Sequence, residues 1–295
     1  MGEHTGIEWA DATINLWWGC TKVSPACTHC YAETLAARFG QAWGPGAERV
    51  RKRGAQALAL KLNRRAERTG ERLRVFALSM GDWLDDEVPA GWLADLLNLV
   101  RVTPALTWML LTKRPQLWRA RLEAALAVAL EGEEGLGTFV GDWLDGRAPA
   151  NVWAGATIED QARCDERLPE LLAIPAAVRF ASCEPLLGPV LIERDVLEAG
   201  ELRWIIGGGE SGRGARPTHP AWACSLRDQA KEYGAAFFWK QWGEFVVPAQ
   251  APPGVDVTHF SLERRSVDED VVFVRVGKKE AGRLLDGREW SEVPA

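Results

Sequence analysis

The chain has 295 residues, 47% of them hydrophobic, and a formal net charge of −6, so it can bury a large core but not coat nucleic acid electrostatically. No apolar run reaches about eighteen residues and the first residues lack a signal-peptide pattern, so we expect neither a membrane span nor a secretory leader. Six cysteines in a chain of this length do not indicate a disulfide scaffold, which predicts a cytoplasmic protein with reduced thiols.

The first chemically distinctive stretch is a loop with three cysteines. Cys20, Cys27 and Cys30 fall inside eleven residues, and the last two form a C-x-x-C. Gly19 and Pro25 predict a loop, and the residues after Cys30 have the apolar spacing of a helix. A loop can fold back and bring three thiolates to one metal site.

Two kinds of metal site are open to three thiolates. An iron–sulfur cluster bound by three cysteines keeps one iron free for a substrate or cofactor. A structural zinc site closes with four ligands. For that closure the remote Cys164, Cys183 or Cys224 is better placed than His29, which lies inside the C-x-x-C.

A cationic run follows the cysteine loop and is expected on a helix over residues 48–68. It consists of Arg49, Arg51, Lys52, Arg53, Lys61, Arg64, Arg65 and Arg68. We interpret it as a solvated helix face with neighbouring glutamates as partners, and a local basic channel is the alternative. The fifteen tryptophans are expected mainly in the core, with a few available to line a pocket.

Apolar segments that read as strands alternate with helical patterns along the chain. The strands are expected at residues 13–17, 74–79, 107–111, 152–156, 178–181, 202–206 and 236–239. The further helices are expected at residues 89–102, 116–130, 160–172 and 219–233, with a Gly- and acid-rich connection over 131–150.

This alternation is typical of a parallel α/β architecture. Because no eighth strand is visible, we predict a partial or irregular (β/α) barrel over residues 1–247, and an open doubly wound sheet is the alternative. Residues 248–295 are expected to form a C-terminal extension with a strand at 271–276 and a helix at 278–285.

Polar side chains follow the predicted strands at their carboxyl ends. They are Asp82, Lys113, Glu159, Glu184 and Glu210. Because the loops after parallel barrel strands meet at one mouth, we expect these side chains beside the cysteine loop. For Glu184 and Glu210 the alternative is a salt bridge with Lys113 or Lys240. Gly207 to Gly209 permit a close backbone approach to a ligand, or form a tight turn.

Several motifs together resemble one known family. They are TGIEWADAT at 5–13, the cysteine loop ending in CYAE at 30–33, LTKRP at 111–115, SCEPLLGP at 182–189, GGESG at 208–212, KQWGE at 240–244 and GRLLDGR at 282–288. The chain resembles a phage- and prophage-associated family of three-cysteine proteins of unknown function. That family is similar to the radical S-adenosylmethionine (SAM) enzymes.

The resemblance implies a [4Fe–4S] cluster on Cys20, Cys27 and Cys30, whose open iron would bind the methionine part of SAM. Reductive cleavage would then give a 5′-deoxyadenosyl radical, which acts on a nucleic acid or nucleotide. The residues expected near SAM or substrate are Tyr31, Ser79, Asp82, Glu159, Glu184, Gly208, Gly209 and Glu210. Lys113, Glu184 and Glu210 are the candidate catalytic residues.

Two features depart from the radical SAM pattern. Six residues separate Cys20 from Cys27, where the superfamily has three, and Gly-Gly-Glu is absent after the second strand. The competing hypothesis, from a different functional class, is a non-catalytic binding protein that is stabilised by zinc and works with a protein partner.

Overall fold

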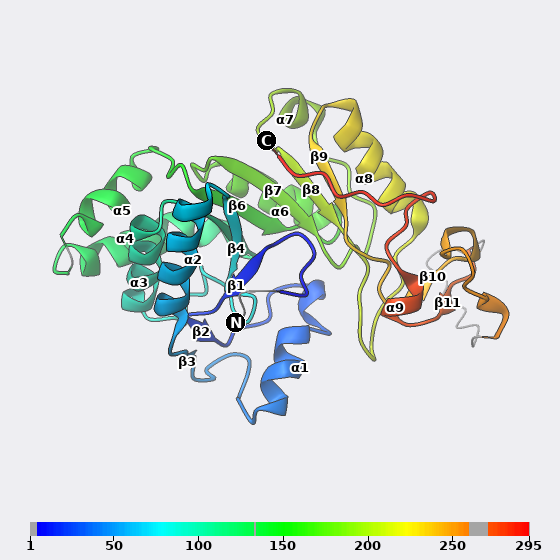
Figure 1. Cartoon of the computed structure of the whole chain (residues 1–295), viewed down its shortest axis with the longest axis horizontal. Coiled ribbons are helices and arrows are strands. Elements are labelled where there is room, and N and C mark those ends of the chain that lie inside the picture. Colours follow the sequence, from blue (N-terminus) through cyan, green and yellow to red (C-terminus); the bar gives the residue numbers. More distant parts are fainter. Residues whose placement is uncertain (1–4, 133, 260–270, 295) are drawn as a thin grey trace. The chain divides into compact units, whose positions relative to one another are not determined.

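The computed structural model describes residues 5–132, 134–259 and 271–294. Its main sheet adds each strand beside the preceding one, in the order β1-β4-β5-β6-β7-β8-β9 (Figure 1). The strands are β1 (Ala12–Ile14), β4 (Leu73–Ala77), β5 (Leu106–Thr112), β6 (Val152–Thr157), β7 (Val178–Cys183), β8 (Trp204–Gly207) and β9 (Ala236–Trp239). β1, β4, β5 and β6 pair in parallel, as do β7, β8 and β9. A doubly wound sheet reverses its strand order at a switch point, whereas a (β/α) barrel adds strands in sequence, so the predicted partial-barrel sheet is confirmed.

The chain divides into two compact units. The first consists of Met1–Ser24, Cys30–Ala156 and Pro169–Arg179, and the second of Pro25–His29, Thr157–Leu168 and Phe180–Ala295. Cys20 and Cys30 therefore belong to the first unit and Cys27 to the second. The predicted boundary at residue 247 stays a prediction.

The first unit contains an amphipathic helix after a short hairpin. The hairpin pairs β2 (Trp17–Trp18) with β3 (Val50–Arg51), antiparallel, and leads into α2 (Ala55–Thr69). The buried residues of α2 recur every three or four positions, as one face of a helix requires. Left-handed glycines mark its two ends, Gly54 with φ 85° and Gly70 with φ 72°.

Four further helices belong to the first unit. They are α1 (Tyr31–Arg38), α3 (Ala90–Val102), α4 (Trp118–Ala129) and α5 (Leu136–Leu144). The predicted connection over 131–150 is wrong, because α5 occupies its middle. Leu136, Val140 and Trp143 form the buried face of α5, which packs beside α3 and α4 (Figure 1). The helical spacing of these three apolar residues is hard to recognise in the sequence, because glycines and acidic residues lie between and around them.

The second unit contains α7 (Arg194–Glu198), α8 (Pro220–Glu232), α9 (Lys278–Ala281) and the antiparallel pair β10 (Phe245–Val246) and β11 (Val274–Arg275). α6 (Gln161–Leu172) begins in this unit and ends in the first. Short 3-10 helices lie at Pro25–Cys27, Pro115–Leu117, Pro248–Gln250 and Val257–His259.

The C-terminal extension pairs with the outer edge of β9. The Trp239 amide donates to the Trp290 carbonyl at 3.0 Å, and the Glu292 amide donates to the Phe237 carbonyl at 3.1 Å. The last residues therefore cover a sheet edge that would otherwise present unpaired backbone groups. The predicted helix at 278–285 is shorter because Gly282, with φ 65°, ends α9.

Ten of the fifteen tryptophans are buried and the other five are half-buried, so the expected core role is confirmed. Among the described residues, no helix has both the length and the apolar character that a membrane crossing requires.

Candidate functional site

The three cysteines lie where the chain passes from β2 through a 3-10 turn into α1. Cys30 is the residue immediately before α1 and has extended backbone angles, φ −61° and ψ 121°. The predicted arrangement, a cysteine loop that feeds a helix, is therefore confirmed. Cys20, Cys27 and Cys30 are all reduced thiols.

In the first unit, the loops after β1, β4 and β5 meet. The Gly19 amide donates to the Met80 carbonyl at 3.0 Å, and Gly19 and Gly81 form a parallel bridge. Arg114, which follows β5, donates to the Thr21 carbonyl at 2.6 Å. The expectation that strand-end loops converge at one mouth holds within this unit.

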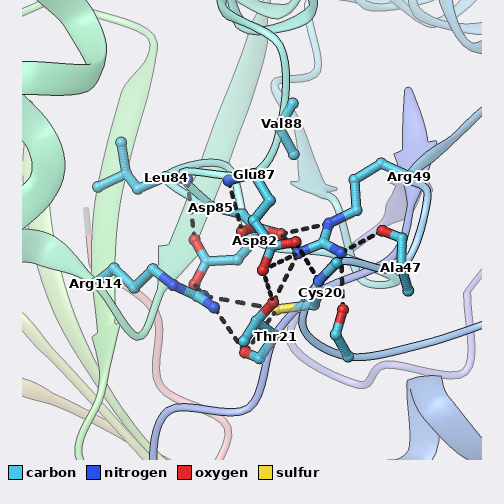
Figure 2. A network of polar contacts seen from close by, with 12 residues as sticks. Cys20, Thr21, Ala47, Arg49, Asp82, Leu84, Asp85, Glu87, Val88 and Arg114 are labelled. Carbon is cyan, nitrogen blue, oxygen red and sulfur yellow. Dashed lines mark hydrogen bonds and ion pairs between the residues drawn. The ribbon is translucent and has the colours of Figure 1, made fainter.

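Arg114 is part of a polar network around Cys20 (Figure 2). Its guanidinium lies 3.6 Å from the Cys20 sulfur and 2.9 Å from the Asp82 carboxylate. Burial, and next the charge of Asp82, raises the pKa of the Cys20 thiol to about 12. The thiol is therefore protonated at neutral pH and must release its proton to bind a metal.

Asp82 uses both carboxylate oxygens inside this network. It accepts hydrogen bonds from the Thr112 hydroxyl at 2.7 Å, the Lys113 amide at 3.0 Å and the Leu84 amide at 3.0 Å, besides Arg114. Only 4% of Asp82 is exposed. The resemblance implies that Asp82 lies near SAM. In the structure, the hydrogen bonds of Asp82 hold together the loops after β4 and β5.

Arg49 holds the same loop from another side. It is 5% exposed, lies 2.9 Å from Asp85 and donates to the Thr21 hydroxyl at 2.8 Å. Figure 2 shows Arg49 and Arg114 approaching the Cys20–Thr21 segment from opposite sides of the view. The interpretation of the cationic run as solvated is therefore wrong at Arg49. This side chain is buried and forms ion pairs with Asp85, which is also buried, and with Glu87.

Tyr31 and Ser79, which the resemblance assigns to SAM, meet in the first unit. The Tyr31 hydroxyl donates to the Ser79 carbonyl at 2.6 Å, while 56% of Tyr31 stays exposed. Asn15 donates to the Ser79 hydroxyl at 3.1 Å. The preceding Leu78 has φ 60°, a costly conformation for a bulky residue, so this turn after β4 is strained.

In the second unit, Glu159 holds the middle of the cysteine loop. The Ala26 amide donates to Glu159 at 3.2 Å. The other carboxylate oxygen lies 2.9 Å from Arg167, which also donates to the Thr157 carbonyl at 2.7 Å. Glu159 is fully buried and Arg167 is 2% exposed, so this is a buried ion pair.

Glu210 holds the same segment through Arg216. Arg216 donates to both Glu210 oxygens, at 2.7 and 2.8 Å, and to the Pro25 carbonyl at 3.0 Å. The His29 ring nitrogen lies 3.3 Å from Glu210. Burial would raise the pKa of Glu210, but the hydrogen bonds from Arg216 outweigh it and hold the pKa below its usual value.

Glu184 pairs with Lys240, one of the two partners expected for it, at 3.5 Å. The glycines beside it have a packing reason of their own. A Cβ at Gly208 would lie 2.8 Å from the Glu184 carboxylate, and one at Gly209 would lie 1.9 Å from the Trp242 carbonyl oxygen. These two positions therefore favour glycine, because the Glu184 side chain and the Trp242 backbone occupy the space that a Cβ would need.

We expect Gly209→Ala to lower the free energy of unfolding by about 3 kcal/mol or more, because the methyl group overlaps backbone that cannot retreat. Gly141→Ala is the matched control, since a Cβ there meets nothing within 4 Å. In the middle of α5 that change should be neutral or stabilise by up to about 1 kcal/mol. Urea unfolding checks both, and equal midpoints would contradict the packing role.

Sequence reasoning missed the arginines that hold the site together. Arg114, Arg167 and Arg216 each neutralise a carboxylate that follows a strand. The sequence does carry a signal for two of these arginines, because a carboxylate buried at a strand end requires a cation. Arg167 lies eight residues after Glu159, and Arg216 lies six residues after Glu210.

A protein-family model, described as "Protein of unknown function (DUF5131)", matches residues 4–294. The chain belongs to the DUF5131 family. No curated protein matches it.

Two solved structures are similar to this DUF5131 chain. A single-site mutant of spore photoproduct lyase is 14% identical with a TM-score of 0.46, covering 77% of this chain and 76% of the other. A double mutant of spore photoproduct lyase "with bound AdoMet and dinucleoside spore photoproduct" is 13% identical with a TM-score of 0.43, covering 90% and 69%.

The DUF5131 chain offers a donor set that fits an iron–sulfur cluster in kind, because three reduced thiols lie within one loop. Over the described residues, no three His, Cys, Asp or Glu side chains are gathered in a group that could hold a metal ion. The Cys20 sulfur lies 3.5 Å from the Thr21 carbonyl oxygen.

Proposed function

We propose that the chain is a radical SAM-like iron–sulfur enzyme. The observation that carries the proposal is the set of three reduced thiols on the loop after the first strand of a sequentially ordered parallel sheet. Cys20, Cys27 and Cys30 would hold a [4Fe–4S] cluster and leave one iron open. When bound, the cluster and SAM supply a 5′-deoxyadenosyl radical.

The chain's own residues would position this loop. Arg49 and Arg114 fix the Cys20–Thr21 segment, and Glu159 and Arg216 bind the backbone at Ala26 and Pro25. In this proposal Asp82, Glu159 and Glu210 act through the loop, since their oxygens are engaged by neighbours. They are positioning residues.

The groups proposed to contact SAM or substrate are Tyr31, Ser79, Glu184 and the backbone at Gly208 and Gly209. Tyr31 is anchored through its hydroxyl and presents an exposed ring, which suits stacking on a flat base. Of the three candidate catalytic residues, Lys113 and Glu184 keep that role in this proposal, and Glu210 becomes a positioning residue. The proposed substrate class is a nucleic acid or nucleotide.

Reductive cleavage of SAM tests this function. After anaerobic reconstitution with iron and sulfide, the wild-type protein and a reductant should convert SAM into 5′-deoxyadenosine and methionine, measured by chromatography. Tyr31→Leu should raise the SAM concentration for half-maximal cleavage by about tenfold, whereas Tyr31→Phe should keep most of the stacking. An iron-loaded protein that forms no 5′-deoxyadenosine would contradict the proposal.

A further inference from the structure

The solvent face of α2 carries a continuous cationic stripe. At 100° per residue, Lys61, Arg64, Arg65 and Arg68 fall within an arc of about 100°, opposite the buried face of the helix. Lys61, Arg64 and Arg68 are exposed, and Arg65 is half-buried. Over residues 51–72 there are eight cations and two glutamates, although the whole chain has a net charge of −6.

The arginines of the stripe are not paired with the glutamates expected to accompany them. Glu67 accepts a hydrogen bond from Asn63 at 2.8 Å instead. Arg64, Arg65 and Arg68 form no ion pair with any residue that the structure describes. Like charges three or four positions apart on a helix repel one another, so a bound polyanion would relieve this repulsion.

An aromatic group lies where the chain enters α2. The Lys52 ammonium lies 3.9 Å from the centre of the Trp18 ring, and the Phe39 ring meets Trp18 edge-on at 5.7 Å. Phe39 is 70% exposed. Figure 1 shows β3 leading directly into α2, with β2, which carries Trp18, beside β3.

We propose that this face of the first unit binds a single strand of nucleic acid. Phosphates would lie along Lys61, Arg64, Arg65 and Arg68, and an unstacked base would stack on Phe39. Positive side chains that track a backbone, combined with an exposed aromatic ring, are how proteins bind single strands without reading sequence. The negative charge of the rest of the chain repels a polyanion and so restricts it to this face.

A membrane surface fits the stripe less well. A helix that lies on a bilayer inserts an apolar face, whereas the apolar face of α2 is buried within the unit. The inference deepens the proposed function by narrowing its substrate class to a single strand of nucleic acid, and it rests on that function only for the reason why the chain would bind such a strand. The binding itself requires neither iron nor SAM.

Fluorescence anisotropy with a labelled single-stranded oligonucleotide of mixed sequence, without SAM, tests the proposal between 50 and 200 mM salt, a range over which four phosphate contacts to a single strand lose roughly fifty-fold in affinity. The triple variant Arg64→Gln/Arg65→Gln/Arg68→Gln should bind about tenfold or more weakly at low salt. Its slope of log affinity against log salt should fall by about 2. Phe39→Ala should weaken binding about fivefold or more without changing the slope.

The matched control is Arg119→Gln/Arg147→Gln/Arg194→Gln, which removes the same charge from exposed, ion-paired arginines elsewhere. It should bind within about twofold of wild type, and thermal unfolding should show all variants folded. Three results would overturn the proposal: no binding at low salt, equal losses in both triple variants, or binding to phosphatidylserine vesicles without binding to the oligonucleotide. Strand binding without SAM cleavage would instead refute the proposed chemistry alone.

Discussion

Replacing Arg167 with methionine is expected to lower the free energy of unfolding by about 3–5 kcal/mol, because it leaves the Glu159 carboxylate buried without its cation. Both partners are shielded from solvent, since Glu159 is fully buried and Arg167 is 2% exposed. Their oxygen and nitrogen lie 2.9 Å apart. The effect is large because the remaining charge cannot reach water.

Two variants separate this explanation from a general loss of packing. Arg163→Met removes a more exposed pair with Asp160 on the same helix and should cost at most about 1 kcal/mol. Glu159→Gln/Arg167→Met removes both charges, keeps an acceptor for the Ala26 amide and should recover most of the lost stability. If the double variant is no more stable than Arg167→Met in urea unfolding, the unpaired charge is not the cause.

Cys27→Ala is expected to reduce the iron retained after anaerobic reconstitution from about four atoms per chain to background, since a cluster cannot be held by two thiolates alone. The same loss is expected for Cys20→Ala and Cys30→Ala. Iron and acid-labile sulfide analysis, together with the visible spectrum, measures it.

Cys224→Ala is the matched control for these variants. Cys224 is a reduced, partly exposed thiol that lies 3.5 Å from Asp286, and it should be replaceable without loss of iron. Burial raises the pKa of Cys164 to about 12 and that of the fully buried Cys183 well above its usual value. The partly exposed Cys224 is therefore the remote cysteine that can be replaced with the least disturbance of packing. Equal iron loss in Cys224→Ala would contradict the assignment of the three loop cysteines.

The strands were predictable because each is a short, continuous apolar run that ends in a polar turn. Residues 107–111 and 236–239, for example, appear as β5 (Leu106–Thr112) and β9 (Ala236–Trp239). A buried strand of a parallel sheet needs apolar residues on both faces, which leaves an unambiguous pattern. α5 was missed because it shows only three buried apolar residues among glycines and acids.

The positions of the site carboxylates were predictable, but their contacts with the cysteine loop were not. Strand ends indicate where Glu159 and Glu210 lie, since each follows an apolar run directly. Their contacts with Ala26 and His29 span 133 and 181 residues, a separation about which local patterns carry no information. The same holds for Arg49, whose burial depends on Asp85, 36 residues away.

Metal identity in the protein as purified without oxygen tests the central claim most directly. Iron, sulfide and zinc should be measured on the same sample, together with its visible spectrum. The account predicts a brown protein with about four irons and four sulfides per chain and little zinc. A colourless protein that keeps one tightly bound zinc, and takes up no iron on anaerobic reconstitution, would contradict the radical SAM assignment and support a zinc-stabilised binding protein.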